Sequence, residues 1–480
     1  MGKSTVSISH LRSLLVALVL VFEWTTPTLA ATIHVPADQP TIQAGINVAV
    51  DGDTVLLADG TYTGDGNRDV SFLGKKIVVT SEHGPGFTII DCEGTPDIPH
   101  RAFVAVNGED TSTVISGIAI IGGEASLFST IGSRYGGALY VSNAGLKIDN
   151  CCIEYCSAEF GGGLGMGPGA IVMVNRSTFR YNTCTSLGGA IACYGYPGGA
   201  MLSLIGVVIS HCIAGHAAGG LYLESTTFSL DRTVLYANWG VDEAGAGMCF
   251  DSKIVINSST IAHNSGGGTR DAFTFANDTL IISNSLISHH EGDSAIGIAG
   301  TKNVVLIECT NIFSTAGFGW PDSLAGYYGT NGNISEDPAF CELNTGNLTV
   351  YDNSPCLPGN NQCATLIGAL DVGCVSTGID NDNPALLPER VALLQNYPNP
   401  FNPSTTIRFF LSTRSFVIVE IFNVLGQRIA NLVSVEFPSG EHDVLWNGQS
   451  DAGVASPSGV YLCRLRANGV TLSRKLVLAK

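Results

Sequence analysis

A repeat of about 26 residues in the middle of the chain constrains the fold more than any other feature. Its apolar anchors are Ile153, Phe179, Ile209, Leu235, Ile261, Ile287 and Ile312, at spacings of 26, 30, 26, 26, 26 and 25 residues. Five and seven residues before every anchor stands another apolar residue, as at Ile148, Val174, Leu230 and Ile256. Period-2 alternation within each repeat predicts short strands, and the repeat predicts stacked coils around one apolar interior.

A second column of the repeat is polar or small. Three residues after the anchors stand Cys156, Asn182, Cys212, Asn238, Asn264 and His290. A polar side chain that turns inward at a tight turn can hydrogen-bond the coils on either side, which satisfies the backbone groups of that turn. We therefore expect these residues to form an internal ladder.

The start of the repeat region carries its own signal. Residues 40–50 (PTIQAGINVAV) have apolar residues at helical spacing and predict a short helix that caps the open first coil. This stretch, together with the coils, resembles pectin-lyase-like proteins with a right-handed parallel β-helix. The resemblance covers about residues 32–375 and implies an all-β fold, but it does not specify an activity, because this fold carries lyases, hydrolases, epimerases and non-enzymes.

The N-terminus has the features of a secretory signal peptide over residues 1–30. Lys3 and Arg12 precede an apolar run over residues 14–22, and small residues allow cleavage after Ala30 or Ala31. The run is too short to span a bilayer comfortably, so no transmembrane span is expected after signal removal. Export permits disulfides, and the four cysteines Cys341, Cys356, Cys363 and Cys374 could pair among themselves in three ways.

The last ninety residues differ from the repeats. Residues 376–390 predict a linker, and short strands with turn signals over 391–480 predict a small Ig-like β-sandwich. The motifs YPNPFNP (397–403), WNG (446–448) and SGVY (458–461) resemble the type A sorting domain of the type IX secretion system. They also resemble the Ig-like domain of flagellar hook-capping proteins. The resemblance implies that the type IX secretion machinery is a partner and that the protein is secreted or held at the outer cell surface.

Charge is divided unevenly along the chain. The net charge of −18 is the balance of +1 in residues 1–30, +3 in residues 391–480 and −22 between them. So acidic a body disfavours binding to nucleic acid or to an anionic membrane, and no nucleic acid partner is expected.

The sequence lacks the motifs of the known enzymes with this type of fold. The Asn-Thr-Asp, Gly-His-Gly and Arg-Ile-Lys motifs of polygalacturonase-like enzymes are absent, and no carboxylate cluster suggests a Ca²⁺-dependent lyase. Asp149 and Asp231 share a column but lie three coils apart, about 15 Å, which is too far for a paired acid and base. The segment His289–Asp293 is interpreted as a polar turn rather than a metal site. The sequence thus favours an adhesive, structural or glycan-binding protein over a polysaccharide lyase or glycoside hydrolase, without a cofactor unless Ca²⁺ bridges an anionic polysaccharide.

One surface row is a candidate binding site. Two residues after the anchors stand Tyr155, Tyr181, His211, His263 and His289, interrupted by Ala237. If these side chains point outward, they form a Tyr/His stripe repeating about every 4.8 Å. A pyranose advances by a similar distance, so we expect the rings to be able to stack on successive sugars of a polysaccharide. A solvated surface row is the alternative.

Overall fold

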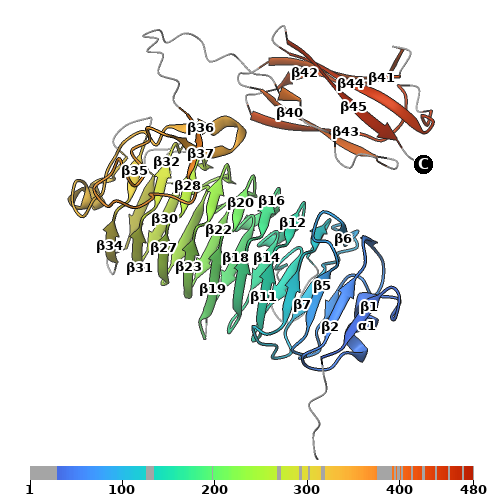
Figure 1. Cartoon of the computed structure of the whole chain (residues 1–480), viewed down its shortest axis with the longest axis horizontal. Helices are drawn as coiled ribbons and strands as arrows, with labels where there is room; N and C mark the ends of the chain where they lie inside the picture. The colour runs from blue at the N-terminus through green and yellow to red at the C-terminus, as the bar shows by residue number, and fades with distance from the viewer. Residues whose placement is uncertain are drawn as a thin grey trace, which may run out of the picture. The chain divides into compact units, whose positions relative to one another are not determined.

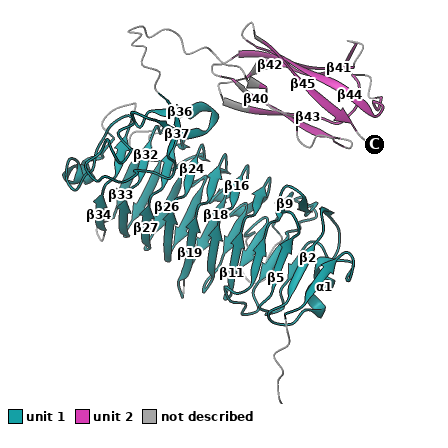
Figure 2. Cartoon of the chain, viewed as in Figure 1, with its two compact units in different colours: residues 1–376 teal, residues 377–480 magenta. Residues whose placement is uncertain are grey.

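The computed structural model describes residues 30–125, 134–196, 198–267, 272–290, 295–300, 303–314, 319–375 and, with short gaps, 392–478. The chain forms two compact units, residues 1–376 and 377–480 (Figure 2). The predicted signal peptide up to residue 29, the predicted linker 376–390 and most of the YPNPFNP motif lie outside the described residues.

The first unit is a right-handed parallel β-helix, as predicted. Its strands lie in stacked rows that run from the blue to the yellow part of the chain (Figure 1). Among the described residues the coils build four parallel sheets, numbered here in the order in which a coil passes through them. Each pair of neighbouring strands comes from successive coils, so like residues lie over like.

The strands of the four sheets, in stacking order, are as follows. Sheet 1 contains β1 (Thr32–Val35), β2 (Thr54–Leu57), β5 (Val78–Ser81), β8 (Val114–Ser116), β11 (Gly145–Asp149), β15 (Ile171–Asn175), β19 (Ala200–Ile205), β23 (Thr226–Asp231), β27 (Lys253–Asn257), β31 (Thr279–Ser283) and β34 (Val304–Glu308). Sheet 2 contains β3 (Gly60–Tyr62), β6 (Thr88–Asp91), β9 (Ala119–Ile121), β12 (Cys152–Glu154), β16 (Thr178–Arg180), β20 (Val208–Ser210), β24 (Val234–Tyr236), β28 (Thr260–Ala262), β32 (Leu286–Ser288) and β35 (Asn311–Phe313). Sheet 3 contains β13 (Ser157–Phe160), β17 (Thr183–Leu187), β21 (Ile213–Ala214), β25 (Trp239–Gly240) and β29 (Ser265–Gly266). Sheet 4 contains β4 (Val70–Ser71), β7 (Phe103–Ala105), β10 (Leu139–Val141), β14 (Leu164–Met166), β18 (Ile191–Tyr194), β22 (Leu221–Glu224), β26 (Gly247–Phe250), β30 (Phe273–Ala276) and β33 (Ile296–Ala299).

The predicted apolar columns form the interior. Ile148, Val174, Leu230 and Ile256 are completely buried in one continuous core, which confirms the register. The cap is α1 (Ile42–Val48), where the side chain of its N-cap residue accepts a hydrogen bond from a backbone N–H. The predicted helix over 40–50 is therefore confirmed.

The corners between sheets 2 and 3 are built by one residue in the left-handed conformation. Tyr155, Tyr181 and His211 have φ of 53°, 56° and 54°. A single such residue bends the strand, so that its own side chain points out and the next residue turns in. Asn182, which follows Tyr181, is completely buried.

The inward residues form the predicted ladder. Asn238 Oδ1 accepts a hydrogen bond from the backbone N–H of Cys212 at 3.0 Å, and its Nδ2 donates to the carbonyl of Ile209 at 2.9 Å. Asn264 repeats this with the coil before it, and His290 Nδ1 accepts from the Asn264 N–H at 3.2 Å. Each unmade bond would leave a buried polar group unsatisfied, at a cost of about 1–3 kcal/mol.

The C-terminal end of the β-helix is closed by irregular chain. It contains η1 (Asp322–Tyr327), β36 (Phe340–Glu342), η2 (Leu343–Thr345), β37 (Asn347–Tyr351) and β38 (Val372–Cys374). Disulfides join Cys341 to Cys374 and Cys309 to Cys363. The Cys309–Cys363 bond differs from the prediction, because Cys309 was not among the four cysteines expected to pair with one another. Cys356, the remaining member of that group, is a buried free thiol.

The second unit contains two antiparallel sheets, in agreement with the predicted sandwich. One contains β39 (Ala392–Leu393), β40 (Thr405–Leu411) and β43 (Gly440–Trp446). The other has the order β42 (Arg428–Phe437), β41 (Ser415–Asn423), β44 (Gly459–Ala467) and β45 (Val470–Leu478). Buried aromatic residues such as Trp446 and Phe409 fill the core. Among the described residues, no helix is long and apolar enough to cross a membrane.

We predict that His290 makes the β-helix sensitive to acid. Burial lowers the pKa of His290 to about 3, whereas an unfolded histidine titrates near pH 6.5. The unfolded chain therefore binds the extra proton first, and stability is lost as pH falls from about 6.5 towards 3. Between pH 7.5 and 5, the wild type should lose about 2 kcal/mol more than His290→Asn, whose side chain matches the rest of the ladder.

The measurement is the unfolding free energy at the two pH values. His216→Asn is the matched control, because His216 is exposed, and it should keep the wild-type loss. Equal acid losses in His290→Asn and the wild type would refute the prediction.

Candidate functional site

The structure places the predicted row along the corner between sheets 2 and 3. Tyr155, the most exposed member at 42%, is followed by Tyr181, His211, His263 and His289, all with positive φ and all partly exposed. Tyr236 fills the interruption at Ala237, because its ring contacts His211 at 5.5 Å and His263 at 5.8 Å between centroids.

The rings of this row stack on each other. The centroids of Tyr155 and Tyr181 lie 5.3 Å apart with the ring planes 10° from parallel, and those of Tyr181 and His211 lie 5.1 Å apart at 29°. Rings side by side in one plane would need a larger separation, since facing carbon atoms stay about 3.5 Å apart. The ring faces are thus turned towards each other. Neighbouring rings therefore cover each other's faces, and the binding of successive sugars by this row stays a prediction.

The C-terminal half of the row also contacts the segment over residues 319–375 that closes the end of the β-helix, called the closing segment below. His289 lies between Phe313 and Phe340, with centroid distances of 5.3 and 5.5 Å. Burial lowers the pKa of His289, although the negative charge of Asp337 acts in the opposite direction and raises it. Tyr236 Oη donates to the carbonyl of Leu343 at 2.8 Å. The row away from this segment is therefore reduced to Tyr155, Tyr181 and His211.

The other candidates are not assembled into sites. His290 is buried in the ladder while His289 points outward, so the two do not share one face, and Glu291–Asp293 lie outside the described residues. Asp149 pairs with Arg176 at 2.6 Å, and Asp231 accepts from Asn257 at 2.8 Å. Strand register confirms that Asp149 and Asp231 lie three coils apart.

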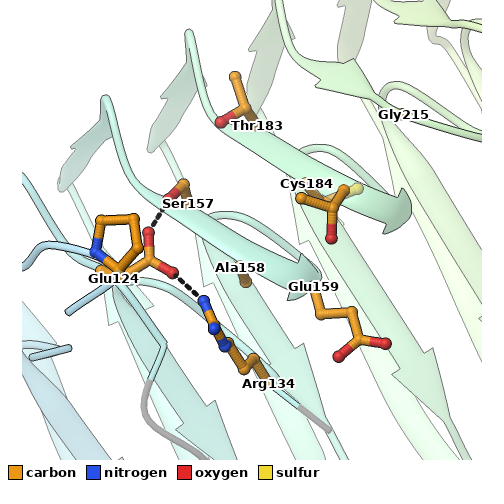
Figure 3. A pocket seen from close by; sticks show the side chains of 10 residues that line it. Glu124, Arg134, Ser157, Ala158, Glu159, Thr183, Cys184 and Gly215 are labelled. Carbon is orange, nitrogen blue, oxygen red and sulfur yellow. Dashed lines mark hydrogen bonds and ion pairs between the residues drawn. The ribbon is translucent and has the colours of Figure 1, made fainter.

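A groove on the outer face of sheet 3 is a candidate binding site that the sequence did not predict (Figure 3). Its volume is about 740 Å³. The lining residues are Pro96, Glu124, Arg134, Ser157, Ala158, Glu159, Thr183, Cys184, Thr185 and Gly215. The floor of the groove consists of β13 and β17. The polar residues Ser157 and Glu159 on β13, and Thr183 and Thr185 on β17, alternate with inward residues, and this alternation was the one sequence pattern that could have indicated a polar outer face. The wall residues Glu124 and Arg134 flank an insertion in the repeat. Because an insertion does not follow the repeat, the position of these two residues could not be predicted from it.

Two of the charges in the groove, those of Glu124 and Arg134, pair with each other. Glu124, largely buried, accepts a hydrogen bond from Ser157 through one oxygen and pairs with Arg134 Nη1 at 3.1 Å through the other. Glu159 points away from Glu124 (Figure 3). Because both Glu124 oxygens are engaged, the groove is better suited to hydrogen-bonded recognition than to proton transfer, which would require Glu124 to give up a partner.

Beyond the groove, apolar side chains continue the outward column of sheet 3 along the solenoid. Strand register places Ser157, Thr183, Ile213, Trp239 and Ser265 in one outward column. Trp239 is 46% exposed, and no aromatic ring of the described residues stacks on it. An exposed indole beside hydroxyl groups provides one apolar and several polar contacts along the same line.

Comparison with known proteins identifies the second unit. Residues 395–479 match the family model described as secretion system C-terminal sorting domain. No curated protein matches the chain. Dimeric latent PorU from Porphyromonas gingivalis is 24% identical over 20% of this chain and only 10% of its own length, with a TM-score of 0.18. XylC in complex with xylose is 8% identical over 89% of this chain and 96% of its own, with a TM-score of 0.26. Neither structural likeness carries an argument here.

The molecule is thus an exported protein built on a right-handed parallel β-helix. Its C-terminal unit is a type IX secretion sorting domain, which implies handling by the type IX machinery and a secreted or cell-surface location.

We predict that the aromatic row stabilises the β-helix. Tyr181→Ala removes two stacked ring contacts and should lower the unfolding free energy by about 1–3 kcal/mol. Tyr196→Ala, which removes a highly exposed tyrosine, is the control and should change it by less than about 0.5 kcal/mol. An unchanged unfolding free energy in Tyr181→Ala would show that the stacking contributes nothing.

Proposed function

We propose that this protein binds a glycan at the cell surface, with a polysaccharide chain lying along the groove of sheet 3. The observation that carries the proposal is the outward column from Ser157 to Trp239, in which two hydroxyl groups are followed by Ile213 and an exposed indole. Coils repeat about every 4.8 Å, and a pyranose advances by a similar distance. A chain along the solenoid axis would thus meet one side chain of this column at each coil.

The polar lining supports recognition of sugar hydroxyls. Thr183 and Thr185 are exposed hydroxyl groups that can donate and accept, and Arg134 and Glu159 add charged partners at the rim. A rigid sheet holds these groups without ordering a loop, which reduces the entropy cost of binding. The same lining does not need Ca²⁺ or another cofactor to bind a neutral glycan.

An enzyme is the second candidate, because two glutamates and an arginine line one groove. A glycoside hydrolase needs two carboxyl groups across the scissile bond, one of them able to give a proton. The engagement of Glu124 with Arg134 and Ser157 argues against that role. Product release in the binding assay distinguishes the two functions.

The test is a panel of neutral and anionic polysaccharides with the purified full chain. Trp239→Ala and Thr183→Arg should each weaken binding about tenfold or more, since loss of an aromatic contact or filling of the groove removes at least about 1.4 kcal/mol. Tyr196→Ala, an exposed aromatic outside sheet 3, should bind like the wild type.

Two results would contradict the proposal. One is binding that survives both Trp239→Ala and Thr183→Arg. The other is release of shortened or unsaturated oligosaccharides by the wild type but not by Glu124→Gln, which would establish catalysis instead.

A further inference from the structure

A cluster of three arginines surrounds one glutamate on the outer face of the four-stranded sheet of the sorting domain. Glu420 of β41 is only 4% exposed. Its Oε2 accepts from Arg464 at 3.0 Å and from Arg466 at 2.9 Å, and its Oε1 accepts from Arg428 at 3.4 Å. These arginines come from β42 and β44, the two strands that flank β41.

This cluster has a surplus of positive charge. Burial alone would raise the pKa of Glu420, but hydrogen bonds and charge from the arginines outweigh it and lower the pKa, so the carboxylate stays ionised. The next carboxylate is Asp451, whose oxygen lies 3.8 Å from Arg428. Two carboxylates thus face three guanidinium groups, so the cluster keeps a net positive charge.

The arginines are fixed in position and still accessible. The side chains of Arg428, Arg464 and Arg466 are 52%, 36% and 46% exposed. Arg464 also lies over the ring of Phe422 at 4.1 Å, so its guanidinium is held on two sides. Guanidinium groups that are held before binding lose less entropy when they bind a carboxylate.

The surroundings have the composition of a protein interface. Val460 and Leu462 alternate with the inward residues of β44 and are exposed beside the arginines. Exposed apolar side chains next to arginine are typical of interfaces between proteins, whereas a site for phosphate or lipid headgroups needs only the charge.

We propose that this face, defined by Glu420, Arg428, Arg464, Arg466 and Leu462, is the docking surface through which an acidic surface of a type IX machinery protein recognises the chain. Glu420 is the positioning residue, and the arginines make the contact. The charge sign fits, because the sorting domain carries +3 while the β-helix region carries −22 and cannot compete for the same partner surface.

The test compares two full-length variants in a host with a type IX system. Removing arginines alone would leave Glu420 buried without enough partners, so the docking variant is Glu420→Gln with Arg464→Gln and Arg466→Gln. Its matched control is Glu420→Gln alone, which keeps the three arginines. A second control is Arg408→Gln, because Arg408 forms a bidentate pair with Asp443 on the other sheet.

The readouts are the surface-exposed fraction and the protease resistance of the domain. We expect surface delivery of the triple variant to fall at least about tenfold at unchanged protease resistance, delivery of Glu420→Gln, which keeps the arginines but loosens their positions, to fall by clearly less, and Arg408→Gln to be delivered like the wild type. Wild-type delivery of a folded triple variant would overturn the proposal, as would an equal loss in Glu420→Gln, which would make the cluster purely structural. Binding of the wild type, but not of the triple variant, to vesicles of anionic lipid would also overturn it in favour of a membrane contact.

Discussion

The hydrogen bonds that the inward ladder makes between coils determine everything else in the β-helix. A corner that turns the chain leaves backbone N–H and C=O groups inside an apolar core, where no water reaches them. Asn238 and Asn264 satisfy these groups from the next coil, so a shift of the ladder residue along its coil would leave them unpaired. This fits the recurrence of coils at about 26 residues. The same constraint puts the outward side chains of every coil into straight columns.

The interior of the β-helix could be predicted from sequence because each coil repeats one chemical environment. Identical environments select similar residues, so Ile148, Val174 and their equivalents reveal the register without any structure. The capping helix was visible for a related reason, since only one face of it meets the first coil. The sorting domain carried motifs of its own, and the family match agrees with them.

The outer surface could not be predicted in the same way, because it depends on orientations and on long-range contacts. Sequence places Tyr155 and Tyr181 on one line, but it does not say that their rings face each other. The groove depends on Glu124 and Arg134, which flank an insertion outside the repeat. Cys309 belongs to a regular coil, and only the closing segment brings Cys363 to it. These features arise where the repeat is broken, so the period holds no information about them.

The two disulfides at the end of the β-helix have a mechanical consequence. A solenoid is weakest at its ends, where a terminal coil has a neighbour on one side only and can be peeled away under load. A surface protein held by its C-terminal domain receives drag through the chain that follows residue 375. Any such pull reaches Cys374 first and passes through its covalent bond to Cys341, while Cys363 ties the same segment to Cys309 in the last regular coil. The pull is therefore passed by covalent bonds into the last regular coil, instead of being borne by the hydrogen bonds of the closing segment alone.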